Sequence, residues 1–407
     1  MVLNDRLETL ARLTDEPDRL TRLYLSPAYR QACDQVQVWM EEAGMAAQID
    51  AVGNVIGRFK SQSPNAPTLI LGSHLDTVRD AGKYDGMLGV VTAIAAVQQL
   101  YDAGLSLPFT LEIHAFGNEE GVRFPSILTG SRAIAGTLDP AILDAKDADG
   151  VSIHKALRTI GCDPDAWRDC RRDQGDILGF PEVHIEQGPV LEAENLPLGV
   201  VTAISGASRF HLQVKGEPGH AGTVPMSHRH DALAAAAEMI LAVERLGRSD
   251  PELVATVGQI ESGPGASNVI PGTATLTIDL RAPDDALRER KIEELQAELY
   301  GIAERRGVEI DIDRFYDAGA AVCSAMFVDQ LEAAIARSGV RPLRLPSGAG
   351  HDGLAIKDLC PIGMLFVRCK DGISHSPKEA IDIEDAVTAV QVMLEFLNSL
   401  DPAMLPK

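Results

Sequence analysis

A histidine and two aspartates near residue 80 have the types and spacing of metal ligands. His74 and Asp76 stand two residues apart at the end of an apolar run, and Asp85 follows on a glycine-containing loop. Side chains two residues apart on a strand point the same way. A neutral imidazole can bind a metal through one nitrogen while a carboxylate holds the other. A strand-end histidine and an aspartate helix cap give the same pattern, so this stretch alone favours neither interpretation.

Two adjacent carboxylates, Glu119 and Glu120, follow the next predicted buried strand, Phe109–Phe116, whose apolar residues alternate weakly with polar ones. Neighbouring side chains in an extended segment point to opposite sides, so the two are not expected to bind one metal together. One could be a ligand while the other accepts a proton from water as a general base. Acidic pairs also occur in solvated turns, but the position at the end of an apolar strand favours a functional role.

Five of the ten histidines lie at predicted strand ends or in loops rich in glycine and serine, where functional groups concentrate. They are His74, His184, His220, His351 and His375. His114, in contrast, lies in the middle of a predicted strand, and we expect it to pack in the core.

Three of these histidines come from well-separated stretches, as metal ligands in α/β enzymes often do. His74, His184 and His375, together with Asp85 and Glu120, provide the donors for a two-metal site if one carboxylate bridges the ions. Imidazole and carboxylate ligands suit zinc, manganese or cobalt. We therefore expect two divalent ions as cofactors.

The elements around these residues alternate between strand and helix. A buried strand ending at His74, a helix from about Leu88 to Gly104 and a strand over Phe109–Phe116 form the repeating unit of a parallel sheet. Sites in such sheets gather at the carboxyl ends of the strands. The sequence predicts an α/β fold with a doubly wound, mostly parallel sheet.

The pattern changes in the middle of the chain. Between about residues 207 and 324, a unit of two strands and a helix is predicted twice. This arrangement indicates a separate small α+β domain with one helical face. The doubly wound pattern then returns. We predict a discontinuous catalytic domain, residues 1–206 and 325–407, interrupted by an inserted domain, residues 207–324.

Composition narrows the class of protein further. A chain of 407 residues, 45% hydrophobic and 24% charged, is typical of a globular protein with two domains. The net charge of −22 and the lack of a basic run argue against a nucleic-acid partner. Six cysteines without a CxxC pair indicate free thiols in a reducing compartment. With no signal-like or membrane-length apolar run, we expect no membrane partner and a cytoplasmic location.

The motifs resemble one known family in their order along the chain, and the match covers nearly all of it. They are His74-Leu75-Asp76-Thr77, Asp85-Gly86, Glu119-Glu120-Gly121-Val122-Arg123-Phe124, His184-Ile185-Glu186-Gln187-Gly188-Pro189, Gly219-His220-Ala221-Gly222, Asn268-Val269-Ile270-Pro271-Gly272 and Ser347-Gly348-Ala349-Gly350-His351-Asp352. They are similar to the amidase branch of the M20 dinuclear metallohydrolases. That branch contains N-carbamoyl-L-amino-acid amidohydrolases, allantoate amidohydrolases and β-ureidopropionases. The peptidases of the family usually have an acidic ligand where this chain has His184.

The resemblance implies a zinc-aminopeptidase-like catalytic domain and a ferredoxin-like inserted domain that acts as lid and dimerisation surface. It also implies roles for the metal ligands. His74, Asp85 and His184 would hold one ion, and Asp85, Glu120 and His375 the other, with Asp85 bridging. The peptide bond after Asp85 would be cis.

The same resemblance implies the residues that act on the substrate. Asp76 would orient His74, and Glu119 would be the general base. His220 would stabilise the oxyanion. The substrate-binding positions it implies are Gln187, His220, Asn268, Arg281, Gly350 and His351. In this family, those of the inserted domain reach the substrate across the interface of a homodimer, although a surface loop at His220 and a simple salt bridge at Arg281 would explain both residues equally well.

The activity implied is metal-dependent hydrolysis of a terminal ureido C–N bond in a small carboxylate, an N-carbamoyl-L-amino acid or allantoate, with release of ammonia and CO2. Two other functions compete with it. One is an M20-type metallopeptidase acting on a small peptide or N-acyl amino acid. The other is a metal-free binding protein, which the loss of a ligand or of Glu119 would favour, and none is lost.

Overall fold

The computed structural model describes residues 2–63 and 65–401 and divides the chain into two compact units. Unit 1 is Met1–Thr202, Cys323–Leu345 and Ala349–Lys407, and unit 2 is Ala203–Val322 with Pro346–Gly348. The inserted domain was predicted at 207–324. Residues 1, 64 and 402–407, which the predicted catalytic domain includes, lie outside the described residues. The role of unit 2 as a lid stays a prediction.

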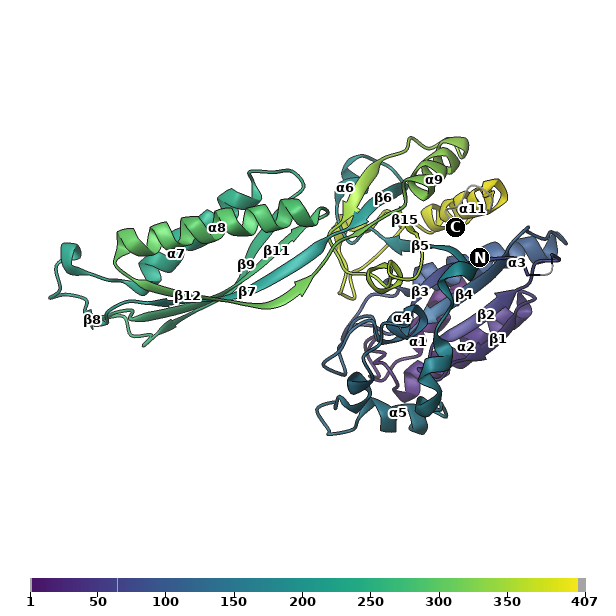
Figure 1. The fold of residues 1–407 in the computed structure, drawn as a ribbon, viewed down its shortest axis with the longest axis horizontal. Helices are drawn as coiled ribbons and strands as arrows, with labels where there is room; N and C mark the ends of the chain where they lie inside the picture. The colour runs from purple at the N-terminus through teal and green to yellow at the C-terminus, as the bar shows by residue number, and fades with distance from the viewer. Residues whose placement is uncertain (1, 64, 402–407) are drawn as a thin grey trace. The chain divides into compact units, whose positions relative to one another are not determined.

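Unit 1 is built on a mixed sheet with a parallel centre (Figure 1). In spatial order its strands are β1 (Ala46–Ile49), β2 (Val55–Phe59), β4 (Thr110–Phe116), β3 (Thr68–His74), β5 (Ile177–Ile185), β15 (Ile362–Val367) and β6 (Leu198–Ile204), with β14 (Arg344–Ser347) beside β6. The four strands from β4 to β15 run parallel, while β1, β2 and β6 pair antiparallel. Every residue of β3, β4 and β15 is buried, as expected where helices cover both faces of a parallel sheet. The α/β prediction is confirmed.

The helices of unit 1 surround this sheet. They are α1 (Val2–Arg12), α2 (Pro27–Glu42), α3 (Met87–Asp102), α4 (Thr129–Ala135), α5 (Ile153–Thr159), α6 (Val190–Ala193), α9 (Ala325–Arg337), α10 (Gly353–Ile356) and α11 (Ile383–Ser399). Short 3-10 helices lie at Pro140–Asp144, Pro164–Cys170, Gln174–Asp176 and Lys370–Gly372. Helix α3 packs on β3, β5 and α11, which explains why it is apolar on nearly every side. Within the described ranges, no helix has the length and apolar character that a bilayer crossing requires.

His114 is buried in β4, as predicted, but it has charged partners there. Its Nε2 lies 2.9 Å from a carboxylate oxygen of Glu112, which also accepts a hydrogen bond of 3.0 Å from Arg172 and pairs with Arg58. Burial alone raises the pKa of Glu112, but the hydrogen bond with His114 and the charge of Arg172 hold that pKa well below its usual range. The ionised carboxylate therefore stabilises the fold.

Replacing Glu112 with glutamine is expected to cost about 2 kcal/mol of unfolding free energy at neutral pH, because the amide cannot match the charged hydrogen bonds. The native pKa is lowered, so this stabilisation is complete above the unfolded value of about 4.3 and is lost as the pH falls below it. Denaturant titrations should show the gap between wild type and Glu112→Gln narrowing in acid. An equal gap at all pH values, or an equal loss in the exposed control Glu41→Gln, would contradict this.

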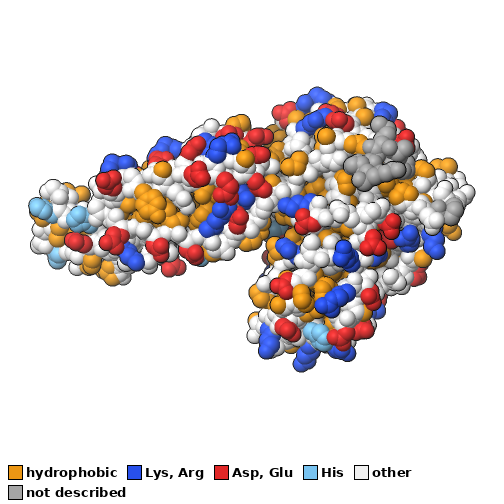
Figure 2. Space-filling view, in the orientation of Figure 1, with side chains coloured by type: hydrophobic (Ala, Val, Ile, Leu, Met, Phe, Trp, Pro, Cys, Tyr) orange, Lys and Arg blue, Asp and Glu red, His pale blue; other side chains and the backbone are white. Residues whose placement is uncertain are grey.

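Unit 2 has the β-α-β-β-α-β order of a ferredoxin-like domain. Its main elements are β7 (Gly206–Lys215), α7 (Ala232–Gly247), β9 (Val254–Gly263), β11 (Thr273–Ala282), α8 (Asp285–Arg306) and β12 (Glu309–Ala318). The antiparallel sheet runs β12-β7-β11-β9. Buried apolar side chains alternate along β7 and β11 and form one core with α7 and α8. Most of the side chains between them are exposed or partly exposed. On the face seen in Figure 2, positive and negative side chains are interspersed over this unit.

Three further short strands lie outside this four-stranded sheet. β8 (Gly219–His220) pairs with β10 (Val269–Ile270), and β13 (Ala321–Val322) pairs with the end of β6. β10 and β11 are separated at Pro271, which cannot donate to a strand ladder.

Candidate metal centre

The predicted ligands of unit 1 come together where the parallel strands end. His74 is the last residue of β3, His184 lies near the end of β5, and Glu120 follows β4. Asp85 immediately precedes the glycine before α3, and His375 lies on the connection from β15 to α11. Because neighbouring parallel strands end at one edge of the sheet, five residues distant in sequence can meet there.

Asp85 lies between all three histidines. Its Oδ1 is 3.3 Å from Nε2 of His74 and 3.1 Å from Nε2 of His184. Its Oδ2 is 3.2 Å from Nε2 of His375, which lies 3.6 Å from a carboxylate oxygen of Glu120. One oxygen thus faces one pair of histidines and the other faces the remaining donors, which is the arrangement of a bridging carboxylate.

The other ring nitrogens of the two buried histidines are held by main-chain carbonyls. Nδ1 of His74 lies 2.9 Å from the carbonyl oxygen of Asp76, and Nδ1 of His184 lies 2.9 Å from that of Ile185. A carbonyl only accepts, so Nδ1 of each ring donates to it and Nε2 is the nitrogen that faces Asp85. Both rings are therefore oriented to ligate through Nε2.

Asp76 contacts His74 in a different way from the one expected. The main-chain oxygen of Asp76, and not its carboxylate, bonds the imidazole. The carboxylate instead accepts the backbone N–H groups of Glu119 at 3.1 Å and Glu120 at 3.2 Å. Asp76 thereby ties the loop after β4 to the end of β3, and so holds both glutamates beside His74.

The structure distinguishes the two glutamates. Glu120 has donor atoms within 4.8 Å of both Asp85 and His375, and also belongs to a group with His74 and Glu119. Glu119 belongs only to the latter group. Its Oε1 lies 3.9 Å from where a Cβ on Gly350 would stand, so its carboxylate faces the loop around Gly350. This arrangement favours Glu120 as the ligand and leaves Glu119 beside the site.

The titration of these groups reflects charges crowded in a buried space. Burial raises the pKa of Glu119 well above its usual range, and burial with the charge of Asp85 raises the pKa of Glu120 to about 7. The hydrogen bond with Asp85 raises the pKa of His375 to about 9. Burial opposes ionisation of Asp85, but its three histidine partners hold its pKa well below the usual range.

The donor set fits divalent metal ions. Oε1 of Glu120 and Nε2 of His184 are buried without a hydrogen-bond partner, and each residue belongs to a donor group that includes Asp85. Buried polar atoms normally have partners, so an orphaned acceptor pair among facing carboxylates and imidazoles calls for a cation. Three imidazole nitrogens and two carboxylates are ordinary ligands for zinc, manganese or cobalt.

The predicted substrate-binding residues of unit 1 lie around this centre. Gln187 donates a hydrogen bond of 2.8 Å to Oδ2 of Asp85. The buried ring of His351 lies 4.4 Å from that of His184, centre to centre, and burial lowers its pKa well below the usual range. Gln187 and His375 both adopt left-handed backbone, with φ of 57° and 53°. Such strain in residues other than glycine gathers at functional sites.

The peptide bond between Asp85 and Gly86 is trans, so the expected cis bond is wrong for this structure. The chain turns there through the φ of 70° at Gly86. A Cβ at this position would lie 2.5 Å from the His74 ring, so the close packing also requires glycine.

The predicted residues of unit 2 do not converge. His220 in β8 and Asn268 are joined by the hydrogen bond from the backbone of Ala221 to that of Asn268. Arg281 lies near the opposite end of β11, eight residues beyond Thr273, or about 27 Å at the rise of a strand. Both edges of its guanidinium have partners, since Asp279 accepts from Nε and Nη2 and the carbonyl of Gly348 accepts from Nη1.

Three residues near the centre were missed in the sequence. Glu379 accepts hydrogen bonds from the backbone of Tyr84 and Asp85, and Ser374 lies within hydrogen-bonding distance of Asp85 and Glu379. Glu182, two residues before His184 on the same strand face, accepts from Ser73. Of these three residues, Glu379 could have been suspected from the sequence, because it lies four residues after the predicted ligand His375.

Comparisons with known proteins show which family the chain resembles. The model of the peptidase family M20/M25/M40 matches residues 70–399. Allantoate deiminase 1 of Glycine max is 42% identical, over 97% of this chain and 88% of its own. The N-carbamoyl-L-amino-acid amidohydrolase of Pseudomonas sp. (strain NS671) is 40% identical, over 97% of both chains. An amidase of the hydantoinase/carbamoylase family from Burkholderia multivorans has a similar solved structure, with a TM-score of 0.93, 32% identity and coverage of 100% and 98% of the two chains.

Proposed function

This chain belongs to the peptidase family M20/M25/M40, and from that premise we propose that it hydrolyses a terminal ureido C–N bond in a small carboxylate. The substrate is an N-carbamoyl-L-amino acid or allantoate. The observation that carries the proposal is Asp85, whose two oxygens face three histidines while Glu119 lies beside them. The names of the two relatives, each at 40% identity or more, support a ureido substrate over a peptide.

The donors would suit two divalent ions, for which His74 and His184 would hold one, Glu120 and His375 would hold the other, and Asp85 would serve both. Bound there, they would supply activation of water and polarisation of a carbonyl oxygen. Glu119 accepts the proton of the attacking water and later passes it to the leaving nitrogen. Its surroundings suit that task, since burial raises the pKa of Glu119. His220 donates to the developing oxyanion. An N-carbamoyl amino acid and one water give the amino acid, CO2 and ammonia, while allantoate leaves ureidoglycine.

An ammonia-release assay tests this function. Metal-depleted chain reloaded with zinc, manganese or cobalt is expected to release ammonia from an N-carbamoyl-L-amino acid, from allantoate or from both. The depleted chain should release none. Dipeptides and N-acyl amino acids are the comparison substrates. Their hydrolysis, without ammonia from either ureido compound, would favour the peptidase alternative.

Arg281 is proposed to hold the substrate carboxylate together with Asn268. Asp279 accepts from Nε and Nη2 of Arg281, and the carbonyl of Gly348 accepts from Nη1. Because Nη1 and Nη2 each carry two N–H groups, one N–H on each of them remains for a substrate carboxylate. A lysine cannot bond Asp279 and at the same time present two coplanar N–H donors to a carboxylate. Arg281→Lys is expected to raise KM by about 10- to 100-fold with a smaller change in kcat. Arg209→Lys is the matched control, since Arg209 also bonds Asp279, and an equal effect in both would contradict the assignment.

We also propose a homodimer formed through unit 2. His220 and Arg281 lie too far apart in one chain to contact one small substrate, so a pocket that uses both needs two chains. β9 is one of the two edge strands of its sheet and is exposed along most of its length, with Val254 58% and Ile260 45% exposed. Such an edge can pair with another copy of the chain.

The cytoplasmic location of the protein stays a prediction.

Mixing two inactive variants tests this arrangement. Glu119→Gln and His220→Ala, allowed to exchange subunits, would form heterodimers in which one pocket carries both lesions and the other carries none. Activity is then expected to recover to a fraction of wild type. Exchange verified by mass without any recovery would show that His220 does not act across the interface.

A further inference from the structure

We propose that Glu379 is a positioning residue that sets the place of Asp85 in the metal centre. The inference rests on the proposed two-metal function but concerns a residue to which that function assigns no role. Glu379 is buried and lies 294 residues from Asp85 in the sequence. It belongs to none of the groups of possible metal donors among the described residues.

One carboxylate oxygen of Glu379 holds the main chain that carries Asp85. Oε1 accepts the backbone N–H of Tyr84 at 2.8 Å and that of Asp85 at 3.2 Å. Two consecutive N–H groups converging on one oxygen fix the direction of the chain at that point, and hence the direction in which the Asp85 side chain leaves it. Without the acceptor, both buried N–H groups would lose their partner.

The second oxygen ties the same carboxylate to the segment that carries His375. Oε2 of Glu379 lies 2.9 Å from the hydroxyl oxygen of Ser374, which is 3.0 Å from Oδ2 of Asp85. That hydroxyl also accepts a hydrogen bond of 3.1 Å from Gln187. Glu379 therefore links two ligand-bearing segments, and it does so on the side of Asp85 that faces His375 and Glu120.

The loop before Asp85 is shaped to receive this side chain. A Cβ added to Gly82 would stand 2.3 Å from the Cβ, Cδ and Oε1 atoms of Glu379. The contact includes the root of the side chain as well as its flexible end, so Glu379 could not simply swing aside. Gly82→Ala should consequently displace Glu379 and reproduce the loss of its contacts without removing any ligand.

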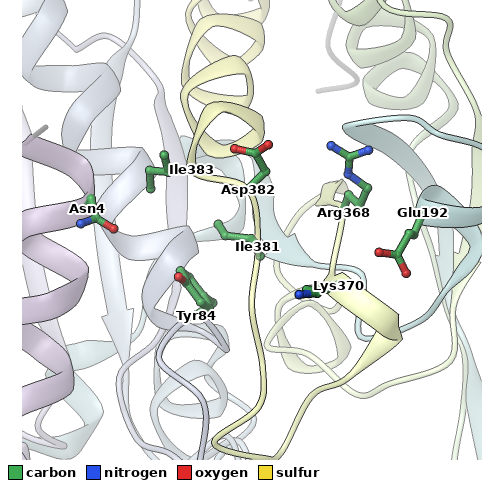
Figure 3. Close-up of a pocket in the computed structure, with 8 residues that line it drawn as sticks. All are labelled: Asn4, Tyr84, Glu192, Arg368, Lys370, Ile381, Asp382 and Ile383. Carbon is green, nitrogen blue, oxygen red and sulfur yellow. The ribbon is translucent and has the colours of Figure 1, made fainter.

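The side chain of Tyr84 points elsewhere and supplies a control. It lines a pocket of about 500 Å³ with Asn4, Ile381 and Asp382 among others, as Figure 3 shows. Only its backbone N–H bonds Glu379. Tyr84→Phe therefore changes the pocket and leaves the proposed positioning contact in place.

Glu186 supplies a second control, matched in chemistry. It too is a buried carboxylate that accepts two backbone N–H groups, from Val190 at 2.7 Å and Leu191 at 2.9 Å. It makes no hydrogen bond to Asp85 or to the segment of His375 among the contacts described. Glu186→Ala should lower the unfolding free energy to a degree similar to Glu379→Ala, without the same effect on the metal centre.

The experiment is a titration of metal-depleted protein with Co2+, followed by calorimetry and by the visible absorption of the bound ion. Wild type is expected to bind two ions. Glu379→Ala and Gly82→Ala should bind one of them about 10- to 100-fold more weakly, with a changed spectrum, as loss of a residue that orients a ligand typically does. Glu379→Gln should stay within a few-fold of wild type, because its amide oxygen still accepts the two N–H groups. Tyr84→Phe and Glu186→Ala should match wild type.

Two results would overturn the inference while leaving the proposed function intact. One is wild-type affinities and spectrum in Glu379→Ala. The other is a loss in Glu186→Ala, or in Glu379→Gln, as large as that in Glu379→Ala, since general destabilisation or loss of charge would then be the cause. A wild-type chain that binds no Co2+ would refute the two-metal function and the inference together. Because the readout is binding, neither result depends on which substrate is hydrolysed.

Discussion

Glu119→Gln is expected to bind two metal ions as wild type does and to lose about 10²- to 10⁴-fold in kcat, the usual contribution of a general base. The amide keeps the shape of the side chain but cannot accept the proton of water. The backbone N–H of Glu119 would still bond Asp76, so the loop after β4 should keep its place. Metal analysis of the purified variant, beside steady-state kinetics on whichever ureido compound wild type hydrolyses, gives both quantities.

His184→Ala is the opposite case and serves as the comparison. It removes an Nε2 that lies 3.1 Å from Asp85, so metal content should fall together with activity. Glu42→Gln, an exposed change on α2, controls for the substitution itself. Equal metal loss in Glu119→Gln and His184→Ala would contradict the division between base and ligand.

Asp85→Ala is expected to abolish binding of both ions and reduce turnover to background. Among the residues that the structure describes, this is the side chain that contacts the histidines on both sides of the centre, through Oδ1 to His74 and His184 and through Oδ2 to His375. Without it, His74, His184 and His375 would lose the carboxylate that they share, although His375 would keep its contact with Glu120. Metal analysis after gel filtration should find neither ion in the variant.

His375→Ala tests whether Asp85 serves both ions while His375 serves only one. It removes a donor only from the side of the centre that Asp85 faces with Oδ2, so it should lose one ion and keep the other. Asp102→Ala, at the far end of α3 from Asp85, should keep both. If Asp85→Ala retained one ion while His375→Ala lost both, Asp85 would not be the bridge.

The sequence by itself determined the fold class, the strand ends and the candidate ligands. The apolar run that leads to His74 can be recognised locally because burial on both faces leaves no polar alternation, whereas the strand Phe109–Phe116 before Glu119 is recognised by its weak alternation. Parallel strands then oblige those ends to meet at one edge. The order of the motifs identified the family, which the match over residues 70–399 confirms.

Only the tertiary structure decided how these residues are held. No local pattern shows that Asp76 bonds His74 through its main chain and the Glu119 loop through its carboxylate, since either group could do either. The separation of His220 from Arg281 follows from the length and direction of β11 in an antiparallel sheet. The contact of Glu379 with Asp85 joins segments 294 residues apart. Such a hydrogen bond depends on how the chain packs, and chain packing produces no periodic pattern in the sequence.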